Sequence, residues 1–274
     1  MINFPNAKIN LGLNVLRKRD DGFHDIETVF YPLNFRDALE LLQQTQTNDP
    51  VAFSVTGLSV DSSMQDNLCM KAYMLLKKEF PQLPPVKIHL HKTIPMGAGL
   101  GGGSADAAFM LKLLNDKFKP GLTPSQLRDH AVQLGSDCPF FIINKPCFAT
   151  GRGEMLEEIP LDLSAYKILL VNPGIHINTG WAFSQISPRF PAKAVKEIIQ
   201  QPITTWKAEL VNDFETVIFP AHPLLKDIKE ELYRHGAIYA AMSGSGSTVF
   251  GIFNNPVSPA LFPGKNYFIK SLDC

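Results

Sequence analysis

Five glycines fall within seven positions of the segment PMGAGLGGGS, which runs from Pro95 to Ser104. Glycines at this density let backbone N–H groups approach a ligand closely, and they cost too much chain entropy for a simple turn. The apolar pattern that follows predicts a helix over about residues 104–114. Because the N-terminus of a helix carries unpaired N–H groups and the positive end of its dipole, the segment is predicted to bind a phosphate group.

The better-known glycine motifs do not fit this segment. A Walker A loop would need a lysine after Gly103, where Ser104 stands. Gly97, Gly99 and Gly102 match the Rossmann spacing, but a proline-broken link and another helical pattern follow where that fold needs a strand and an acidic residue. The H-R-D and D-F-G motifs of protein kinases are absent from the sequence. The Rossmann match is therefore interpreted as accidental.

Other residues suited to phosphate chemistry lie far from the glycines in sequence. Lys8 and Asn10 share the polar face of NAKINLGLNVL, and Asp137 stands between Gly-Ser and the apolar run CPFFII. Taken alone, a lysine on the polar face of a strand is more often solvated. An aspartate at such a place is equally suited to capping a helix and to acting as a base. A second glycine-serine segment, MSGSGSTVFG, would by itself more often be a tight turn than a phosphate contact.

The elements predicted to position these residues include both strands and helices. NAKINLGLNVL, HDIETVFYPL, AFSVTGLSV, VKIHLHKTI, KILLVNPG and AIYAAM read as strands, the first of them half-buried. Helices are predicted after Asp66 as N-cap, from Thr123 to Gly135, and over HPLLKDIKEELYRHG. Strands come in runs without regular alternation with helices, which favours an α+β fold. A division falls near residues 154–165, where acidic residues and a proline precede a new strand.

Composition narrows the class of protein. The chain has 274 residues, 45% of them hydrophobic, and its 26 Lys and Arg balance 26 Asp and Glu. A net charge of zero weakens a nucleic-acid or membrane-surface role. The first residues do not resemble a signal peptide, and no apolar run approaches a membrane span. Four cysteines without a C-x-x-C pair are expected to be free thiols in the cytoplasm: Cys69, Cys138, Cys147 and Cys274.

Together these segments resemble the GHMP small-molecule kinases over nearly the whole chain. IPMGAGLGGGSADAA alone would indicate this superfamily, and AKINLGL, DGFH, LGSDCPFF, GRGE, NDFE and MSGSGSTVFG make the resemblance more specific. The resemblance implies a ribosomal-S5-like domain over residues 1–158, a ferredoxin-like domain over residues 159–274, and a site in the cleft. One departure is Phe23, where the family commonly has tyrosine, so ring stacking is kept and a phenolic hydrogen bond is lost.

The implied activity is ATP-dependent phosphorylation of an alcohol group on a small molecule with a cytidine end. Asp137 would take the proton of the hydroxyl, and Lys8 would orient Asp137, keep it ionised and stabilise the transferring charge. ATP would enter with Mg²⁺, whose protein ligands the sequence does not identify. The residues implied to bind ATP are Asp66, Asn67, Pro95, Met96, Gly97, Ala98, Gly99, Leu100, Gly101, Gly102, Gly103, Ser104 and Ala105. Those implied to bind the substrate are Asn10, Phe23, His24, Thr179 and Phe183.

Two alternatives stay open. The first is a GHMP kinase for homoserine, mevalonate or a sugar, against which the DGFH turn and the region of Phe183 argue. The second is a catalytically silent relative that binds ATP as a sensor, against which Lys8 and Asp137 argue. The sequence predicts no nucleic-acid or membrane partner and does not give the oligomeric state.

Overall fold

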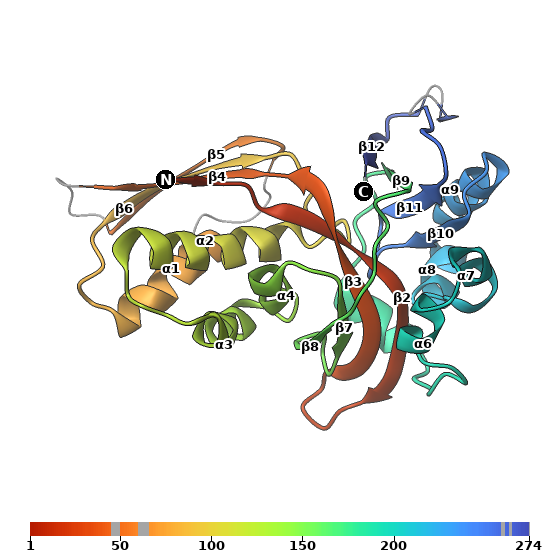
Figure 1. Cartoon of the computed structure of the whole chain (residues 1–274), viewed down its shortest axis with the longest axis horizontal. Coiled ribbons are helices and arrows are strands. Elements are labelled where there is room, and N and C mark those ends of the chain that lie inside the picture. The colour runs from red at the N-terminus through yellow and green to blue at the C-terminus, as the bar shows by residue number, and fades with distance from the viewer. Residues whose placement is uncertain (45–49, 60–65, 259–260, 263–264, 274) are drawn as a thin grey trace. The chain divides into compact units, whose positions relative to one another are not determined.

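A computed structural model describes residues 1–44, 50–59, 66–258, 261–262 and 265–273 (Figure 1). The chain forms two compact units, and each draws on segments that are distant in sequence. The first unit comprises Met1–Ala7, Phe35–Met96 and Gly101–Lys145, and the second comprises Lys8–Asn34, Gly97–Leu100 and the chain from Pro146 onward. The glycine segment is therefore divided between the two units, because Gly97–Leu100 belongs to the second unit and the residues from Gly101 onward belong to the first. The domain boundary expected between residues 158 and 159 stays a prediction.

The first unit is built on a four-stranded sheet of order β1-β4-β6-β5. Its strands are β1 (Ile2–Asn3), β4 (Ala38–Gln43), β5 (Val51–Gly57) and β6 (Val86–Lys92). β5 and β6 are parallel, whereas the other pairs are antiparallel. Leu39 pairs with Leu90 and Leu41 with Ile88, and all four side chains are buried. These side chains form the face of the sheet that packs on helices.

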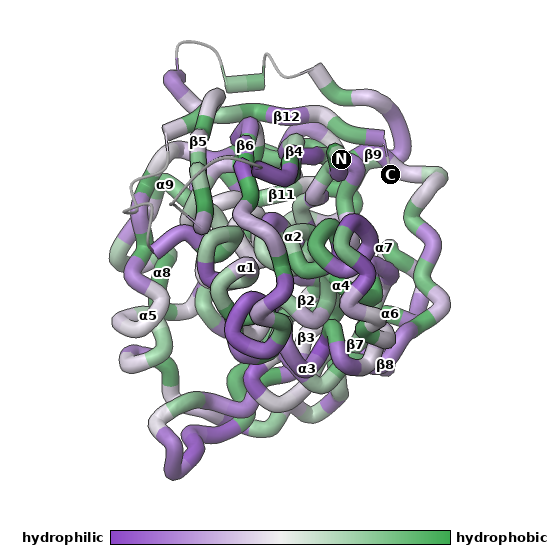
Figure 2. The backbone as a smooth tube through the Cα atoms, turned by 90° about the vertical axis from the view of Figure 1, so that its left-hand side faces the viewer, coloured by the Kyte–Doolittle hydropathy of each residue, from purple (hydrophilic) through white to green (hydrophobic). Residues whose placement is uncertain are grey.

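The described part of this unit also contains the helices α1 (Leu68–Glu79), α2 (Gly102–Phe118), α3 (Pro124–Leu134) and α4 (Cys138–Ile143). Figure 1 shows α1 and α2 lying along one face of the sheet. Ten of the 17 residues of α2 are buried, and its hydrophobic stretches can be followed in green in Figure 2. α2 is thus the central helix of the unit.

The ends of these helices test the expected caps. The N-cap of α1 is Asn67, whose side chain accepts a hydrogen bond from the Cys69 N–H, so the expectation of Asp66 was wrong by one residue. α2 begins two residues earlier and ends four residues later than expected, because left-handed backbone at Gly101 and Lys119 flanks it. The predicted start of α3 is confirmed, with Thr123 as the N-cap in a capping box with Gln126 and with Pro124 as the first helical residue.

In the second unit, one sheet has the order β2-β3-β7-β8. Its strands are β2 (Asn6–Lys18), β3 (His24–Arg36), β7 (Cys147–Thr150) and β8 (Met155–Glu158). β2 and β3 have 13 residues each. β2 begins within the first unit, and β3 ends within it. β2 is buried on both faces from Asn6 to Val15, and the half-buried strand expected from its alternation was wrong.

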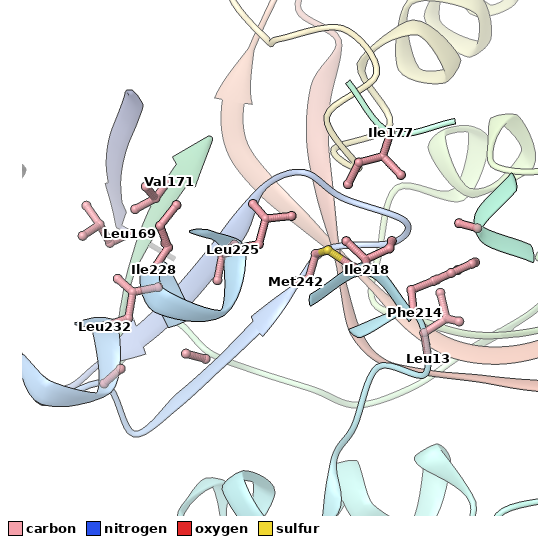
Figure 3. Packing of buried hydrophobic residues seen from close by; sticks show 14 of the residues in the cluster. Leu13, Leu169, Val171, Ile177, Phe214, Ile218, Leu225, Ile228, Leu232 and Met242 are labelled. Atoms are coloured by element: carbon pink, nitrogen blue, oxygen red, sulfur yellow. The ribbon is translucent and has the colours of Figure 1, made fainter. Parts of the chain in front are cut away.

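A second sheet has the antiparallel order β10-β11-β9-β12, which is that of a ferredoxin-like domain. The strands are β9 (Lys167–Asn172), β10 (Tyr239–Met242), β11 (Val249–Phe253) and β12 (Phe268–Asp273). The helices are α5 (Thr179–Gln185), α6 (Val195–Ile199), α7 (Ile203–Glu209), α8 (Glu215–Ala221) and α9 (Pro223–Arg234). Figure 3 shows the core, where Leu225, Ile228 and Leu232 of α9 gather with Leu169 and Val171 of β9.

The α+β class expected from the sequence is confirmed by these two units. No helix within the described residues has the length and apolar character that a membrane span requires. Cys69, Cys138 and Cys147 are buried free thiols, as predicted, and Cys274 lies outside the described residues.

Candidate active site

Lys8 is a buried lysine whose ammonium group meets the glycine segment. Its side chain lies on β2 and the residue is 3% exposed. Nζ donates to Asn10 Oδ1 at 2.5 Å and to the carbonyl oxygen of Gly99 at 3.2 Å. It also lies 5.0 Å from the ring centroid of Phe30. A buried ammonium requires partners that offset its desolvation, so this lysine is built into the fold rather than solvated.

Gly97–Leu100, the part of the glycine segment in the second unit, is clamped between β2 and the β10–β11 loop. The Lys8 N–H donates to Leu100 O at 2.9 Å, and Ser243 Oγ donates to Gly99 O at 2.8 Å. Gly99 has a φ of +78°, and a Cβ there would lie 2.0 Å from the carbonyl oxygen of Ser243. The backbones at residues 99 and 243 can therefore approach this closely only if residue 99 is glycine.

The β10–β11 loop is itself held by buried amides. Asn212 Nδ2 donates to Met242 O at 2.7 Å and to Gly244 O at 2.8 Å, so the NDFE segment supports the loop. The Thr248 N–H donates to Ala98 O at 3.2 Å. The MSGSGST segment is thus a support for the glycine segment in addition to being a turn between strands.

The first-unit part of the glycine segment forms the start of α2. Gly101 is the N-cap in left-handed conformation, and Gly102, Gly103 and Ser104 are the first helical residues, followed by buried Ala105. The N–H groups at the start of an α-helix have no intrahelical carbonyl partner, which makes this end suitable for an anion. Pro95 and Met96 precede it, and Met96 is 44% exposed.

Asp137 occupies the N-cap position of α4 in the first unit, half-buried and without a side-chain capping hydrogen bond. Its expected place at the start of a helix is therefore confirmed, but its side chain makes no capping hydrogen bond, and the role of catalytic base stays a prediction. The next residue, Cys138, shares a hydrogen bond with Ser104, which joins α4 to the start of α2. Burial raises the pKa of the Cys138 thiol to about 12, with that hydrogen bond opposing the rise.

The residues expected to bind the substrate fall into two places within the second unit. The His24 ring stacks on Phe183 with centroids 4.9 Å apart, and Thr179 Oγ1 lies 2.9 Å from Ser245 Oγ in the β10–β11 loop. Burial, and then the charge of Lys18, lowers the pKa of His24, which favours the neutral imidazole. Phe23 is 51% exposed and packs on a different residue, the guanidinium of Arg152, at 4.5 Å.

Asn10 and the two residues before α1 complete the expected set. Asn10 Nδ2 donates to Thr28 Oγ1 at 3.1 Å, which fixes its Oδ1 toward Lys8. Asp66 is exposed and pairs with Lys71 at 3.4 Å, while Asn67 caps α1. Within the described ranges, no three His, Cys, Asp or Glu side chains gather as a metal site.

Sequence reasoning missed four residues that shape this region: Thr28, Arg152, Asn212 and Ser243. Thr28 is a small polar residue whose partners lie on a neighbouring strand, so no local spacing signals it, whereas Ser243 lies in MSGSGSTVFG, which the sequence marks without showing its contacts. Arg152 and Asn212 lie in GRGE and NDFE, segments that the sequence marks without showing their contacts.

Comparisons with known proteins agree on one family. The model of the GHMP kinases N terminal domain matches residues 67–145, and that of the GHMP kinases C terminal region matches residues 194–262. The chain is 54% identical to a 4-diphosphocytidyl-2-C-methyl-D-erythritol kinase of Bacteroides fragilis over 93% of this chain and 92% of that protein. It is 51% identical to the protein of that name from Cytophaga hutchinsonii, covering 93% of each chain.

Solved structures give the same picture. A crystal structure of 4-(cytidine 5′-diphospho)-2C-methyl-D-erythritol kinase matches with a TM-score of 0.83 and 29% identity, covering 100% of both chains. A mevalonate kinase matches with a TM-score of 0.74 at 13% identity, covering 99% of this chain and 98% of that one, and this match shows a shared fold.

Proposed function

We propose that this chain, which belongs to the family of 4-diphosphocytidyl-2-C-methyl-D-erythritol kinases within the GHMP kinases, transfers the γ-phosphoryl group of ATP to the 2-hydroxyl of that cytidyl compound. This reaction belongs to the non-mevalonate route to isoprenoid precursors and would take place in the cytoplasm. The observation that carries the proposal is the buried Lys8 ammonium on the glycine segment, within a chain about half identical to kinases of that name.

ATP would bind through its phosphates at the glycine segment. Backbone N–H groups at the start of α2 and its dipole attract anions, and the glycines let the phosphates approach the backbone. Mg²⁺ would arrive as the MgATP complex. Such ions are commonly held by substrate phosphates, water and one or two carboxylates, so a preformed cage of side chains is not required.

Phosphoryl transfer depends mainly on positioning and on stabilising charge. Lys8 would supply positive charge to the transferring group, since Asn10 and Gly99 hold its ammonium in one place. Asp137 would accept the proton of the 2-hydroxyl, a role suited to a half-buried carboxylate.

The cytidine end would bind at the aromatic group of His24 and Phe183, with Phe23 and Thr179 nearby in sequence. A pyrimidine ring would stack on the face of Phe183 that His24 now covers, after His24 moves aside. The neutral imidazole of His24 would then hydrogen-bond to the base. Phe23 would offer a second ring face, because its side chain is half exposed even though Arg152 packs over the ring.

A coupled assay for ADP release tests the proposal on the purified full chain. We expect turnover with 4-diphosphocytidyl-2-C-methyl-D-erythritol and little with homoserine, mevalonate or galactose. Efficient turnover of one of these controls in place of the cytidyl compound would refute the substrate. A folded protein that binds ATP and phosphorylates none of them would favour the silent relative.

A further inference from the structure

A buried ion cluster lies beneath the glycine segment in the first unit. Lys92, the last residue of β6, has a fully buried side chain whose Nζ donates to a carboxylate oxygen of Asp37 and to Asp106 Oδ2, the latter at 2.8 Å. Asp37 immediately precedes β4, and Asp106 lies in the second turn of α2. Three elements that are distant in sequence therefore meet at one ammonium group.

The cluster holds both ends of the glycine segment. At the entry, Asp37 Oδ1 accepts hydrogen bonds from the N–H groups of Thr93 at 2.6 Å and Ile94 at 2.9 Å, directly before Pro95. At the exit, a Cβ on Gly102 would lie 3.3 Å from Lys92 Nζ and 3.0 Å from Ile94 Cγ2. The first residue of α2 thus packs directly on the lysine, which fixes how far apart the two ends lie.

The charge of this cluster bears on an anion bound above it. Two carboxylates and one ammonium would leave a net negative charge, which would oppose phosphate at the start of α2. Burial raises the pKa of Asp106 to about 7, with Lys92 opposing the rise and Asp37 adding to it. Asp106 Oδ1 is buried without a hydrogen-bond partner among the described residues, and a proton on this carboxyl would allow it to donate to Asp37.

The other titratable groups around the cluster do not change this charge near neutral pH. Cys69 of α1 is fully buried, and burial, reinforced by Asp106, raises its pKa well above its usual value. Cys138 of α4 also has a raised pKa. Both thiols are therefore neutral, so the proton on Asp106 decides the net charge of the cluster.

We propose that Lys92, Asp37 and Asp106 position the glycine segment for nucleotide binding, and that this cluster takes up a proton when the nucleotide binds. The proposal rests on the proposed function, because it assumes that the glycine segment holds the phosphates of ATP. These are positioning residues, since they act through the backbone of the segment and through its electrostatic potential.

Isothermal titration of a non-hydrolysable ATP analogue with Mg²⁺ tests this on the full chain. Titrations at pH 6, 7 and 8, in buffers of different ionisation enthalpy, give affinity and proton uptake together. Comparing the wild type with Asp106→Asn cancels the titration of the nucleotide itself. Between pH 6 and pH 8, the affinity of the wild type for the analogue should fall by up to about tenfold more than that of Asp106→Asn. At pH 8, the wild type should also take up more protons on binding than Asp106→Asn does.

A second pair of variants separates positioning from stability. Lys92→Met should lower the affinity for the ATP analogue by about tenfold or more. It should leave the Michaelis constant for the cytidyl substrate within about twofold of the wild-type value. Lys112→Met removes a half-buried lysine of the same unit, which lies on α2 and donates a hydrogen bond to Phe141 O, and it should leave nucleotide affinity unchanged. If Lys92→Met does not fold, Asp106→Asn alone decides, because it is close to isosteric and removes a buried charge.

Identical pH profiles and proton uptake in the wild type and Asp106→Asn would overturn the proposal, as would equal losses of affinity in Lys92→Met and Lys112→Met. A wild type that does not bind the analogue would overturn the ATP assignment and this role with it. A wild type that binds while Asp106→Asn behaves identically would overturn the positioning role alone.

Discussion

The imidazole of His24 stacks on the ring of Phe183, with the ring planes inclined by 12°. His24 opens β3, and Phe183 lies on α5, so the stack joins two elements of the second unit. Phe183 also meets buried Phe214 edge to face, with centroids 4.9 Å apart. This packing holds one aromatic face in a fixed orientation, which suits stacking on a planar base.

Removing the Phe183 ring should therefore weaken binding of the cytidyl substrate more than it slows turnover. Base stacking contributes about 1–3 kcal/mol, so Phe183→Ala should raise the Michaelis constant by about ten- to a hundredfold. Phe183→Leu keeps apolar contact with Phe214 and loses the π face, so it should show most of the same effect. Steady-state kinetics with the ADP-release assay measures both, with exposed Phe190→Ala as the control. Unchanged constants in both Phe183 variants would contradict the stacking role.

The sequence predicted best what depends on local chemistry. The helix that Thr123 caps and helix α9 follow from side chains within a few residues of each other. The cap of α1 was missed because Asp66 and Asn67 are both good caps, and the local geometry of the chain selects between them.

What the sequence could not give is burial caused by distant segments. The polar face of β2 reads as solvent-exposed, yet Gly99 and Ser243 cover it, which is why Lys8 is buried. The contact of His24 with Phe183 also depends on how β3 and α5 pack. The family resemblance named these residues, but their partners became visible with the fold.

Lys8→Met should lower the turnover number by about a hundredfold or more while the protein stays folded. Methionine fills similar space, but it removes the charge that would stabilise the transferring phosphoryl group. It leaves Asn10 Oδ1 and Gly99 O without this donor, so we expect a stability loss of about 1–3 kcal/mol. Circular dichroism and the kinetic assay measure the two effects. A folded and fully active Lys8→Met protein would exclude the catalytic role.

Asp137→Asn should lower turnover by about a hundredfold or more and leave ATP binding nearly intact, which is the scale of a lost general base. The Asp137 side chain makes no capping hydrogen bond to α4, so the substitution should not remove a helix cap. Thr123→Ala is the matched control, since it removes a real capping box and should cost about 1 kcal/mol with activity retained. Wild-type turnover in Asp137→Asn would remove this residue from its role.

Gly99→Ala should damage the glycine segment beyond the strain of its backbone. Its Cβ would lie 2.0 Å from Ser243 O, whereas a Cβ on Gly236, at a φ of +89°, meets nothing within 4 Å. Gly236→Ala should therefore cost about 1–2 kcal/mol, the usual penalty of left-handed backbone. Gly99→Ala should lower the free energy of unfolding by more than this and should weaken ATP binding by about tenfold or more. Calorimetry of unfolding and of ATP binding measures both, and equal effects of the two substitutions would refute the close approach.

Lys112 on α2 should make the free energy of unfolding rise with pH in the alkaline range. Burial lowers the pKa of its ammonium to about 8 in the folded protein, with Asp116 opposing this, and the side chain donates to Phe141 O at 2.8 Å. An unfolded lysine keeps its proton up to about pH 10.4. Between these values the unfolded state binds more protons than the folded state, so stability increases as pH rises through this window.

Urea unfolding of the wild type and Lys112→Met at pH 7, 8, 9 and 10 measures this contribution. The stability of the wild type relative to the variant should rise by about 1–3 kcal/mol between pH 7 and pH 10, because one pKa unit corresponds to about 1.36 kcal/mol and solvent screening reduces the total. Other alkaline titrations are common to both proteins and cancel in the difference. Exposed Lys226→Met serves as the control and should show no such change. Parallel stability curves for the wild type and Lys112→Met would show that Lys112 titrates like an ordinary lysine.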